Sequence, residues 1–339
     1  MLDTLRELCL INGISGDEGR VRDYIISKIK DKCTYEVDPM GNILAFKKGK
    51  NEPKNKVMLS AHMDEVGFIV TYICDNGFLK FTNVGGIDPK VAVGRAVSVG
   101  DNAVMGVIGN KAVHLCHGDE EKTVPKLDKL YIDIGAKDKS EAEKLVSLGD
   151  SVHFISDFVE FGEDKVKAKA IDDRFGCAIM LKMIDSELEY DTNFAFLVQE
   201  EVGCRGASAA VFSIRPDYAI VLEATTASDI SGVSDEDRVC VQGKGAVVSF
   251  MDRSTVYNRD LFKGAFALAK EKNIPIQPKT TVAGGNDAGA IHKACSGVYT
   301  IAVSLPCRYI HSGTSVGDKK DMTACYDLAV ALTEEYANA

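Results

Sequence analysis

The sequence predicts an α/β protein in which a β-rich segment interrupts a larger domain. Short apolar strands alternate with amphipathic helices near both ends of the 339-residue chain. Between about residues 67 and 162 the pattern changes to many short β-like runs separated by glycines. Alternating strands and helices favour a largely parallel sheet covered on both faces, whereas the short runs are typical of a small β-barrel or sandwich.

The first part of the chain predicts two helices followed by three strands. Residues 1–11 have the apolar spacing and the charges of an amphipathic helix. Ser15 and Glu18 have the spacing of a capping box, which predicts that a second helix opens there. Strands are expected at residues 35–37, 43–46 and 57–61, and the third strand ends at His62.

The middle segment and the last part of the chain predict different elements. In the middle, strands are expected at residues 68–73, 91–93, 96–99 and 103–108, with one charged helix at residues 140–145. In the last part, buried strands are expected at residues 194–198, 218–222 and 298–305. Helices are expected there at residues 177–184, 207–212, 259–272 and 328–336. The middle segment is therefore interpreted as a second domain inserted into the first.

Charge and composition exclude several classes of partner. The net charge is −10 and no basic run is present, so we expect no binding to nucleic acid. No segment has about 18 consecutive apolar residues, so we expect no membrane span. The N-terminal pattern is not that of a secretion signal, and the ten cysteines are scattered without CxxC pairs. These features predict a cytoplasmic protein with reduced thiols.

Five short segments carry side chains that can bind metal ions, and most of them directly follow a predicted buried strand. These residues are His62 with Asp64, Asp172 with Asp173, Glu200 with Glu201, Glu223, and His311. Open α/β sheets place their sites at the carboxyl ends of strands. Taken singly, each segment also has a simpler explanation: a histidine paired with a carboxylate, aspartates that cap a helix, or carboxylates in water.

Taken together, the five segments favour a metal centre. They supply two histidines and three carboxylates as ligands and leave further carboxylates over. Such a set can hold two divalent cations that share one aspartate, each with one further histidine and one further carboxylate. Mixed nitrogen and oxygen donors favour Zn²⁺ or Co²⁺ over Mg²⁺ or Ca²⁺. A carboxylate that binds no metal could then take the proton of an activated water.

These segments, in this order, resemble the tetrahedral (TET) aminopeptidases, a family of dizinc exopeptidases with glutamyl, leucyl, lysyl and deblocking members. The resemblance covers the whole chain and includes residues 15–18, 130–136, 251–253, 284–290 and 307–312. It implies a three-layer α/β/α catalytic domain formed by residues 1–67 and 164–339. It also implies that residues 68–163 form a small β-barrel domain that mediates dimerisation. Dimers of the family assemble into hollow tetrahedral dodecamers that trim small peptides.

The resemblance also assigns metal ligands. The terminal ligands of one ion would be His62 and Glu223. Those of the other ion would be Glu201 and His311, and Asp172 would bridge the two ions. The implied cofactors are therefore two divalent ions per subunit, Zn²⁺ or Co²⁺.

Two further carboxylates would serve catalysis. Glu200 would be the general base, and Asp64 would orient the ring of His62. The implied activity is the removal of N-terminal residues from peptides by an activated water. Three alternatives remain. One is a glycoside hydrolase, since some relatives are labelled endoglucanases. The others are another metal enzyme, such as a deacylase or carboxypeptidase, and a non-catalytic subunit that only forms a shell. We expect structural or surface roles for the remaining histidines, which are His114, His117, His153 and His292.

Overall fold

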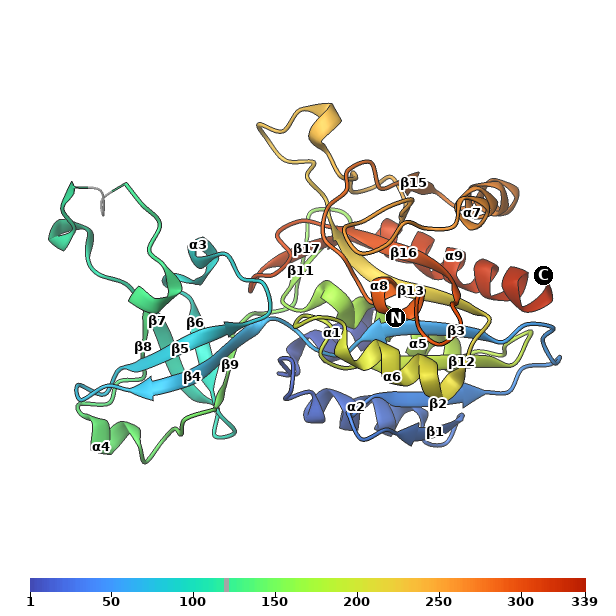
Figure 1. Ribbon diagram of the computed structural model, residues 1–339. Helices are drawn as coiled ribbons and strands as arrows, with labels where there is room; N and C mark the ends of the chain where they lie inside the picture. Colours follow the sequence, from blue (N-terminus) through green and yellow to red (C-terminus); the bar gives the residue numbers. More distant parts are fainter. Residues whose placement is uncertain (119–121) are drawn as a thin grey trace.

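The computed structural model describes residues 1–118 and 122–339, which form a large body built on a sheet and a smaller barrel that projects from it (Figure 1). The chain enters the barrel after β3 (Val57–His62) and leaves it after β9 (Ser151–Phe154). Within these described residues, no helix has both the length and the apolar character that a membrane span requires.

The large body is built on an eight-stranded sheet with strand order β1-β2-β12-β3-β13-β16-β14-β15. Its remaining strands are β1 (Thr34–Val37), β2 (Ile43–Lys47), β12 (Thr192–Leu197), β13 (Tyr218–Thr226), β16 (Tyr299–Cys307), β14 (Ala246–Val248) and β15 (Ile276–Pro278). The four central strands β12, β3, β13 and β16 run parallel. Every side chain of β3 is buried, as expected of a parallel strand covered on both faces.

Helices cover both faces of this sheet and make it the middle of three layers (Figure 1). One face packs against α1 (Leu2–Leu10), α2 (Gly19–Ile29), α5 (Ile171–Asp185), α7 (Arg259–Lys272) and α9 (Lys319–Asn338). The other face packs against α6 (Arg205–Ile214) and α8 (Ala288–Ile291). In α2, the buried residues Val21, Ile25 and Ile29 recur every four positions and form one apolar face. The predicted α/β fold class is confirmed.

The smaller body is a closed antiparallel barrel with strand order β4-β5-β8-β7-β6-β9. Its other strands are β4 (Gly67–Ile73), β5 (Leu79–Val84), β6 (Ala96–Val99), β7 (Val104–Gly109) and β8 (Tyr131–Asp133). Inside it, the ring of Phe68 meets Phe81 and Phe154 edge to face, with centroids 4.9 and 5.3 Å apart. A three-stranded sheet of β10 (Val159–Phe161), β11 (Lys165–Ala168) and β17 (Ser315–Asp318) lies beside the junction (Figure 1).

Several predicted elements of the middle segment differ in the structure. The strand predicted at residues 91–93 is wrong, because residues 91 and 92 belong to helix α3 (Pro89–Ala92) and Val93 is its C-cap. Asp88 caps that helix by accepting a hydrogen bond from the amide of Lys90, and proline stands at its first position. The charged helix expected at residues 140–145 is the shorter α4 (Lys139–Ala142). The strands that were not predicted are mostly short or partly exposed: β5, β8, β9, β10, β11, β14, β15 and β17.

The predicted capping box is also wrong, and its two residues have other partners. Ser15 Oγ donates to Asp64 Oδ2 at 2.6 Å. Glu18 Oε1 accepts from the amides of Gly16, at 2.8 Å, and Gln199, at 3.2 Å. Helix α2 does begin directly after Glu18, but no side chain caps it. These bonds instead tie the N-terminal loop to the segments that carry the predicted site.

Candidate metal centre

The predicted ligands meet at one edge of the large sheet, where its parallel strands end. His62 is the last residue of β3, Glu223 lies within β13, and Glu201 comes shortly after β12. His311 follows β16, and Asp172 is the second residue of α5. Pairing of β12, β3, β13 and β16 in parallel brings their carboxyl ends together, which is where open α/β sheets hold their sites.

The carboxylate of Asp172 lies between the two histidines. Its Oδ1 is 3.2 Å from His62 Nε2, and its Oδ2 is 3.6 Å from His311 Nε2. His62 Nε2 is also 3.6 Å from Glu223 Oε1. His311 Nε2 is 3.4 Å from Glu201 Oε2. Each oxygen of Asp172 therefore faces a separate pair made of one histidine and one glutamate.

Asp64 is fully buried and contacts His62, Ser15 and the segment that carries Glu200 and Glu201. Its backbone oxygen lies 3.0 Å from His62 Nδ1, and its Oδ1 lies 3.5 Å from the same nitrogen. Its carboxylate also accepts hydrogen bonds from the amides of Glu200 and Glu201, both at 3.1 Å. The hydroxyl of Ser15 supplies the third donor. Asp64 thus connects the end of β3 to the loop that carries both glutamates.

Asp173 has a different environment from Asp172, to which a cis peptide bond joins it. Its Oδ1 accepts from the amide of Gly176 at 3.0 Å, which is the helix-capping role considered for these aspartates. Its Oδ2 has no hydrogen-bond partner in the described part of the chain. Ligand atoms of Asp173, His62 and Glu223 lie within 4.8 Å of one another. Asp173 is therefore a further candidate ligand, in addition to its role as a cap.

The electrostatics of the site show crowded negative charge. Burial raises the pKa of Glu201 to about 8, and the charge of Asp172 adds to this shift. Burial and then Asp172 also raise the pKa of Glu223 well above its ordinary value. Burial opposes the charged form of His311, but Asp172 and Glu201 raise its pKa to about 9. Divalent cations fit these donors, because they would offset the excess charge and accept both nitrogen and oxygen ligands.

A cavity of about 630 Å³ opens onto these side chains. Its lining includes Asp172, Glu200, Glu201, Glu223, His311, Ser254, Lys279 and Asn286. Lys279 is buried, and its Nζ donates to the carbonyl oxygen of Ala283 at 2.6 Å. Lys279 and Ser254 are not among the predicted site residues. Lys279 directly follows β15, a strand of three residues that the sequence pattern did not predict.

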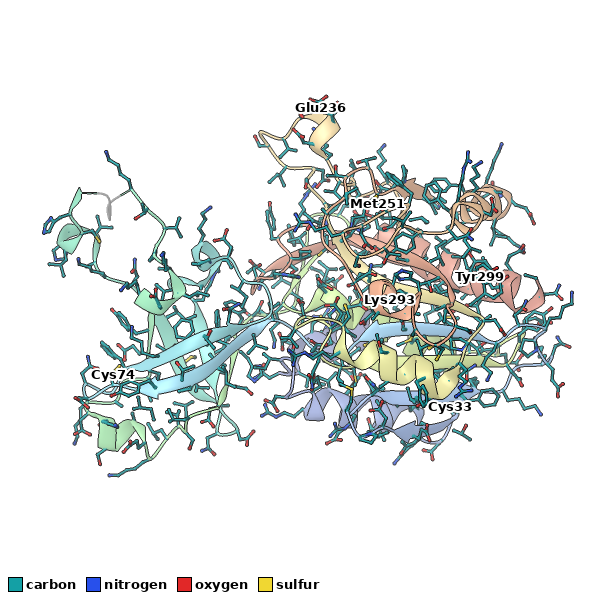
Figure 2. All side chains as sticks on the ribbon, in the orientation of Figure 1. Cys33, Cys74, Glu236, Met251, Lys293 and Tyr299 are labelled. Atoms are coloured by element: carbon teal, nitrogen blue, oxygen red, sulfur yellow. The ribbon has the colours of Figure 1, made fainter. Side chains whose placement is uncertain are left out.

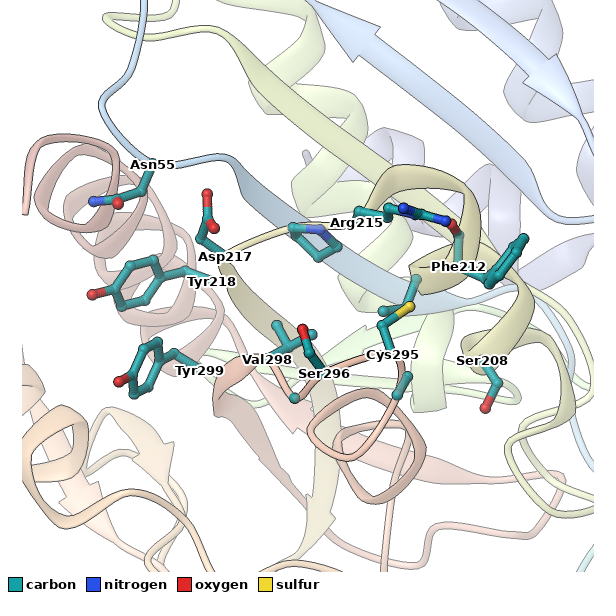
Figure 3. A pocket seen from close by; sticks show the side chains of 14 residues that line it. Asn55, Ser208, Phe212, Arg215, Asp217, Tyr218, Cys295, Ser296, Val298 and Tyr299 are labelled. Carbon is teal, nitrogen blue, oxygen red and sulfur yellow. The ribbon is translucent and has the colours of Figure 1, made fainter.

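A second cavity, of about 740 Å³, lies at the opposite end of two of the same strands (Figure 3). Tyr218 and Tyr299, the first residues of β13 and β16, line it together with Arg215 and Asp217. None of the predicted site residues is part of its lining. The candidate functional site is therefore the cavity at the carboxyl ends of the strands.

The histidines without a predicted role lie outside this centre. His153 is buried in β9, with its Nε2 3.7 Å from Asp17 Oδ2. The ring of His292 bonds a backbone carbonyl one turn earlier, at 2.6 Å. His114 and His117 are exposed on the barrel side of the molecule.

Comparison with known proteins gives the family. The model of the M42 glutamyl aminopeptidases matches residues 41–328. The chain belongs to this M42 family. It is 40% identical over 334 residues to a putative aminopeptidase of Acetivibrio thermocellus, with 97% of each chain covered. Membership of the M42 family supports an aminopeptidase, and so a peptide hydrolase, as the function of the chain.

Two solved structures resemble the M42 chain over nearly its whole length. The TET1 peptidase of Pyrococcus horikoshii, which can assemble into a tetrahedron or a large octahedral shell, is 35% identical with a TM-score of 0.86 and 98% of each chain covered. It confirms the resemblance to TET aminopeptidases. A Thermotoga maritima protein named endoglucanase is 36% identical with a TM-score of 0.81, covering 98% of this chain and 97% of its own. The M42 match contradicts the glycoside hydrolase alternative, and that name does not transfer to the chain.

Proposed function

We propose that this M42 member removes N-terminal residues from peptides with the help of two divalent cations, Zn²⁺ or Co²⁺. His62 and Glu223 would hold one ion. Glu201 and His311 would hold the other, and Asp172 would bind both. The position of the Asp172 carboxylate carries this proposal, because its two oxygens face different histidines at 3.2 and 3.6 Å.

Glu200 would act as the general base. When bound, paired divalent ions acidify a water and polarise the peptide carbonyl. Glu200 would take the proton of the attacking water and return it to the leaving amine. Its Oε2 lies 3.9 Å from His62 Nε2 and faces the same cavity as the ligands. Burial, with the charges of Asp172 and Asp64, raises the pKa of Glu200, which brings it closer to the working range of a general base.

Asp64 would be a positioning residue. Its backbone oxygen accepts the Nδ1 proton of His62, which leaves Nε2 free to bind metal. Its carboxylate holds the amides of Glu200 and Glu201. One side chain would thus fix a ligand ring and the backbone of the proposed base.

Substitution Glu200→Gln tests this assignment. Turnover of aminoacyl nitroanilides should fall by about a hundredfold to ten-thousandfold, the range for losing a general base. Two bound ions per chain should remain in elemental analysis, because Glu200 is not a proposed ligand. Glu236→Gln, at an exposed site (Figure 2) that is not part of the cavity lining, is the matched control and should keep full turnover.

A panel of acidic, basic and apolar aminoacyl substrates, before and after chelation and with Zn²⁺ or Co²⁺ restored, completes the test. Full activity in Glu200→Gln would overturn the role of Glu200. If the metal-loaded protein hydrolysed none of the substrates, the alternative of a non-catalytic, shell-forming subunit would replace the proposal.

We also propose that residues 68–163 mediate self-association, while residues 1–67 and 164–339 form the catalytic domain. The related Pyrococcus horikoshii peptidase can assemble into a tetrahedron or a large octahedral shell, and a dodecamer is the expectation here. Met105 and Val107 on β7 are exposed apolar side chains that a second copy could cover. Light scattering should give a mass of several copies, and a monomer at all concentrations would contradict the proposal.

A further inference from the structure

A second cluster of potential ligands lies beside the proposed centre and shares Glu200 with it. Ligand atoms of Glu200, Cys204 and Asp287 lie within 4.8 Å of one another. Glu200 Oε2 faces His62, whereas its Oε1 accepts a hydrogen bond from Cys204 Sγ at 3.4 Å. The two oxygens of this carboxylate therefore face two different spaces.

Asp287 is the unusual member of this cluster. It stands at the N-cap of α8, where an aspartate normally accepts an amide hydrogen bond, but its side chain does not cap the helix. Asn286 does so instead, accepting from the amide of Ala288 at 2.9 Å. The side chain of Asp287 is 2% exposed, and its Oδ1 has no hydrogen-bond partner among residues 1–118 and 122–339. A buried oxygen without a partner is costly, so the site favours a proton or a cation there.

The charges of the cluster also favour a cation. Burial, with a contribution from the charge of Glu200, raises the pKa of Asp287 well above its ordinary value. Two adjacent carboxylates resist being ionised together unless positive charge lies between them. Cys204 and Glu200 line the 630 Å³ cavity, so an ion can reach them from solvent.

We propose that Glu200, Cys204 and Asp287 form a third metal site, which binds a thiophilic divalent ion such as Zn²⁺ or Cd²⁺ and thereby inhibits the peptidase. One sulfur and two oxygens are three of the four ligands that such ions prefer, and water can complete the set. The thiol proton leaves to solvent when the metal binds, because the thiolate is the ligand. The sulfur selects against Mg²⁺ and Mn²⁺, which prefer oxygen donors.

The inhibition rests on the proposed function, because it requires Glu200 to be the base. An ion bound to Glu200 Oε1 draws off the charge that the carboxylate needs to accept a proton. The third ion uses none of the proposed ligands of the two catalytic ions, so those two ions should stay bound. We therefore expect kcat to fall while KM changes little. Rising Zn²⁺ should therefore first activate the enzyme and then inhibit it, whereas rising Mn²⁺ should not inhibit.

A Cd²⁺ titration of the full-length protein tests the site itself. Equilibrium dialysis with elemental analysis counts the bound ions, and the ultraviolet charge-transfer band of a cadmium–thiolate bond identifies the sulfur. Wild type should bind a third ion and develop the band with that third equivalent. In Cys204→Ser the band should be lost and the third ion should bind at least about tenfold more weakly, the lower end of what losing even an outer-shell partner costs.

Cys33→Ser is the matched control. Cys33 is a half-buried thiol just before β1 (Figure 2), and its Sγ donates to the carbonyl of Ile29. This variant should bind the third ion as wild type does. Asp287→Asn provides a second test that keeps the side-chain shape, and it should weaken the third ion while the thiolate band survives at high Cd²⁺.

The possible results separate the site from its effect. Equal third-ion binding in wild type, Cys204→Ser and Asp287→Asn would overturn the site, whatever the enzyme's activity. Specific binding of the third ion without a fall in kcat would overturn the inhibition. A wild-type protein without any peptidase activity would refute the proposed function, while the Cd²⁺ titration would still decide the site.

Discussion

The two halves of the proposed metal centre are built differently. His62 is 1% exposed, and its Nδ1 contacts the backbone oxygen of Asp64, two residues away. The side chain of His311 is 36% exposed, and this residue has a left-handed backbone with φ of 58°. Its Nδ1 contacts the backbone oxygen of Gly86, 225 residues earlier, at 2.8 Å. Gly86 lies between β5 and α3, on the barrel side of the molecule.

This difference indicates how each half becomes ordered. The sheet body alone supplies the contacts that hold His62, because its ring partner belongs to the same chain segment. His311 requires that the barrel is docked, since the carbonyl that orients its ring comes from there. A ligand held by adjacent, buried contacts is more strictly positioned than one held across two bodies. We therefore expect the His62 half to be rigid and the His311 half to be adjustable.

The largest effect is expected where the two halves meet. Asp172→Asn leaves one oxygen acceptor and directs an NH₂ group at one of the histidines. Both ions should bind much more weakly, and kcat/KM should fall by at least about a thousandfold, since metal ions supply several kcal/mol of transition-state stabilisation. Elemental analysis and nitroanilide hydrolysis measure the two losses. Retention of two tightly bound ions would show that the two halves do not share Asp172.

Removing each histidine in turn compares the halves directly. His62→Ala and His311→Ala should each lose one ion, but the metal-free proteins should differ in stability. Burial opposes the charged form of His62, but Asp172, Asp64 and Glu223 raise its pKa well above its ordinary value. The variant His62→Ala loses a buried positive partner of these carboxylates, so its melting temperature in chelator should fall by several degrees. The variant His311→Ala should lose less stability, because water can replace the more exposed ring of His311.

His292→Ala is the control for this pair, because its ring bonds only within its own short helix region and not to the proposed ligands. Its metal content should stay at two ions per chain. Equal loss of stability in the variants at positions 62 and 311 would mean that exposure does not distinguish the two halves.

Part of this site could be predicted from the sequence, because several of its ligands directly follow short apolar runs that are typical of buried strands. His62 and Glu223 mark the ends of apolar strands, and parallel pairing of those strands brings them together. Ser15 and Glu18 show that a local sequence pattern can also give a wrong prediction. Their spacing is that of a capping box, but in the folded chain Ser15 donates to Asp64 and Glu18 accepts from the amide of Gln199.

The remaining features depend on contacts between distant segments. At the start of α8 the side chain of Asn286 caps the helix, whereas that of Asp287, the residue at the N-cap, does not. Lys279 reaches the cavity from a loop, and no periodicity marks that position. The bond between His311 and Gly86 joins residues 225 positions apart across two bodies. Such pairings follow from tertiary packing, which the sequence pattern does not encode locally.

The smallest effect is expected at Gly86, where the barrel side meets His311. A Cβ added at position 86 would lie 3.3 Å from His311 Nδ1, closer than an ordinary contact. Gly86→Ala should therefore displace the ring by a few tenths of an ångström and weaken, but not remove, its bond to the backbone. The ion of the His311 half should bind up to about tenfold more weakly. This loss of affinity is smaller than that expected when a partner of a metal-binding histidine is removed completely.

The ion of the His62 half should be unaffected by Gly86→Ala. Consequently kcat/KM should fall at limiting metal and recover at saturating metal, as measured by titrating the chelated protein with Zn²⁺ or Co²⁺. Gly264→Ala in α7 is the matched control, since nothing lies within 4 Å of its added Cβ. If Gly86→Ala weakened both ions equally, the barrel would act on the whole centre, and the distinction between a rigid and an adjustable half would be wrong.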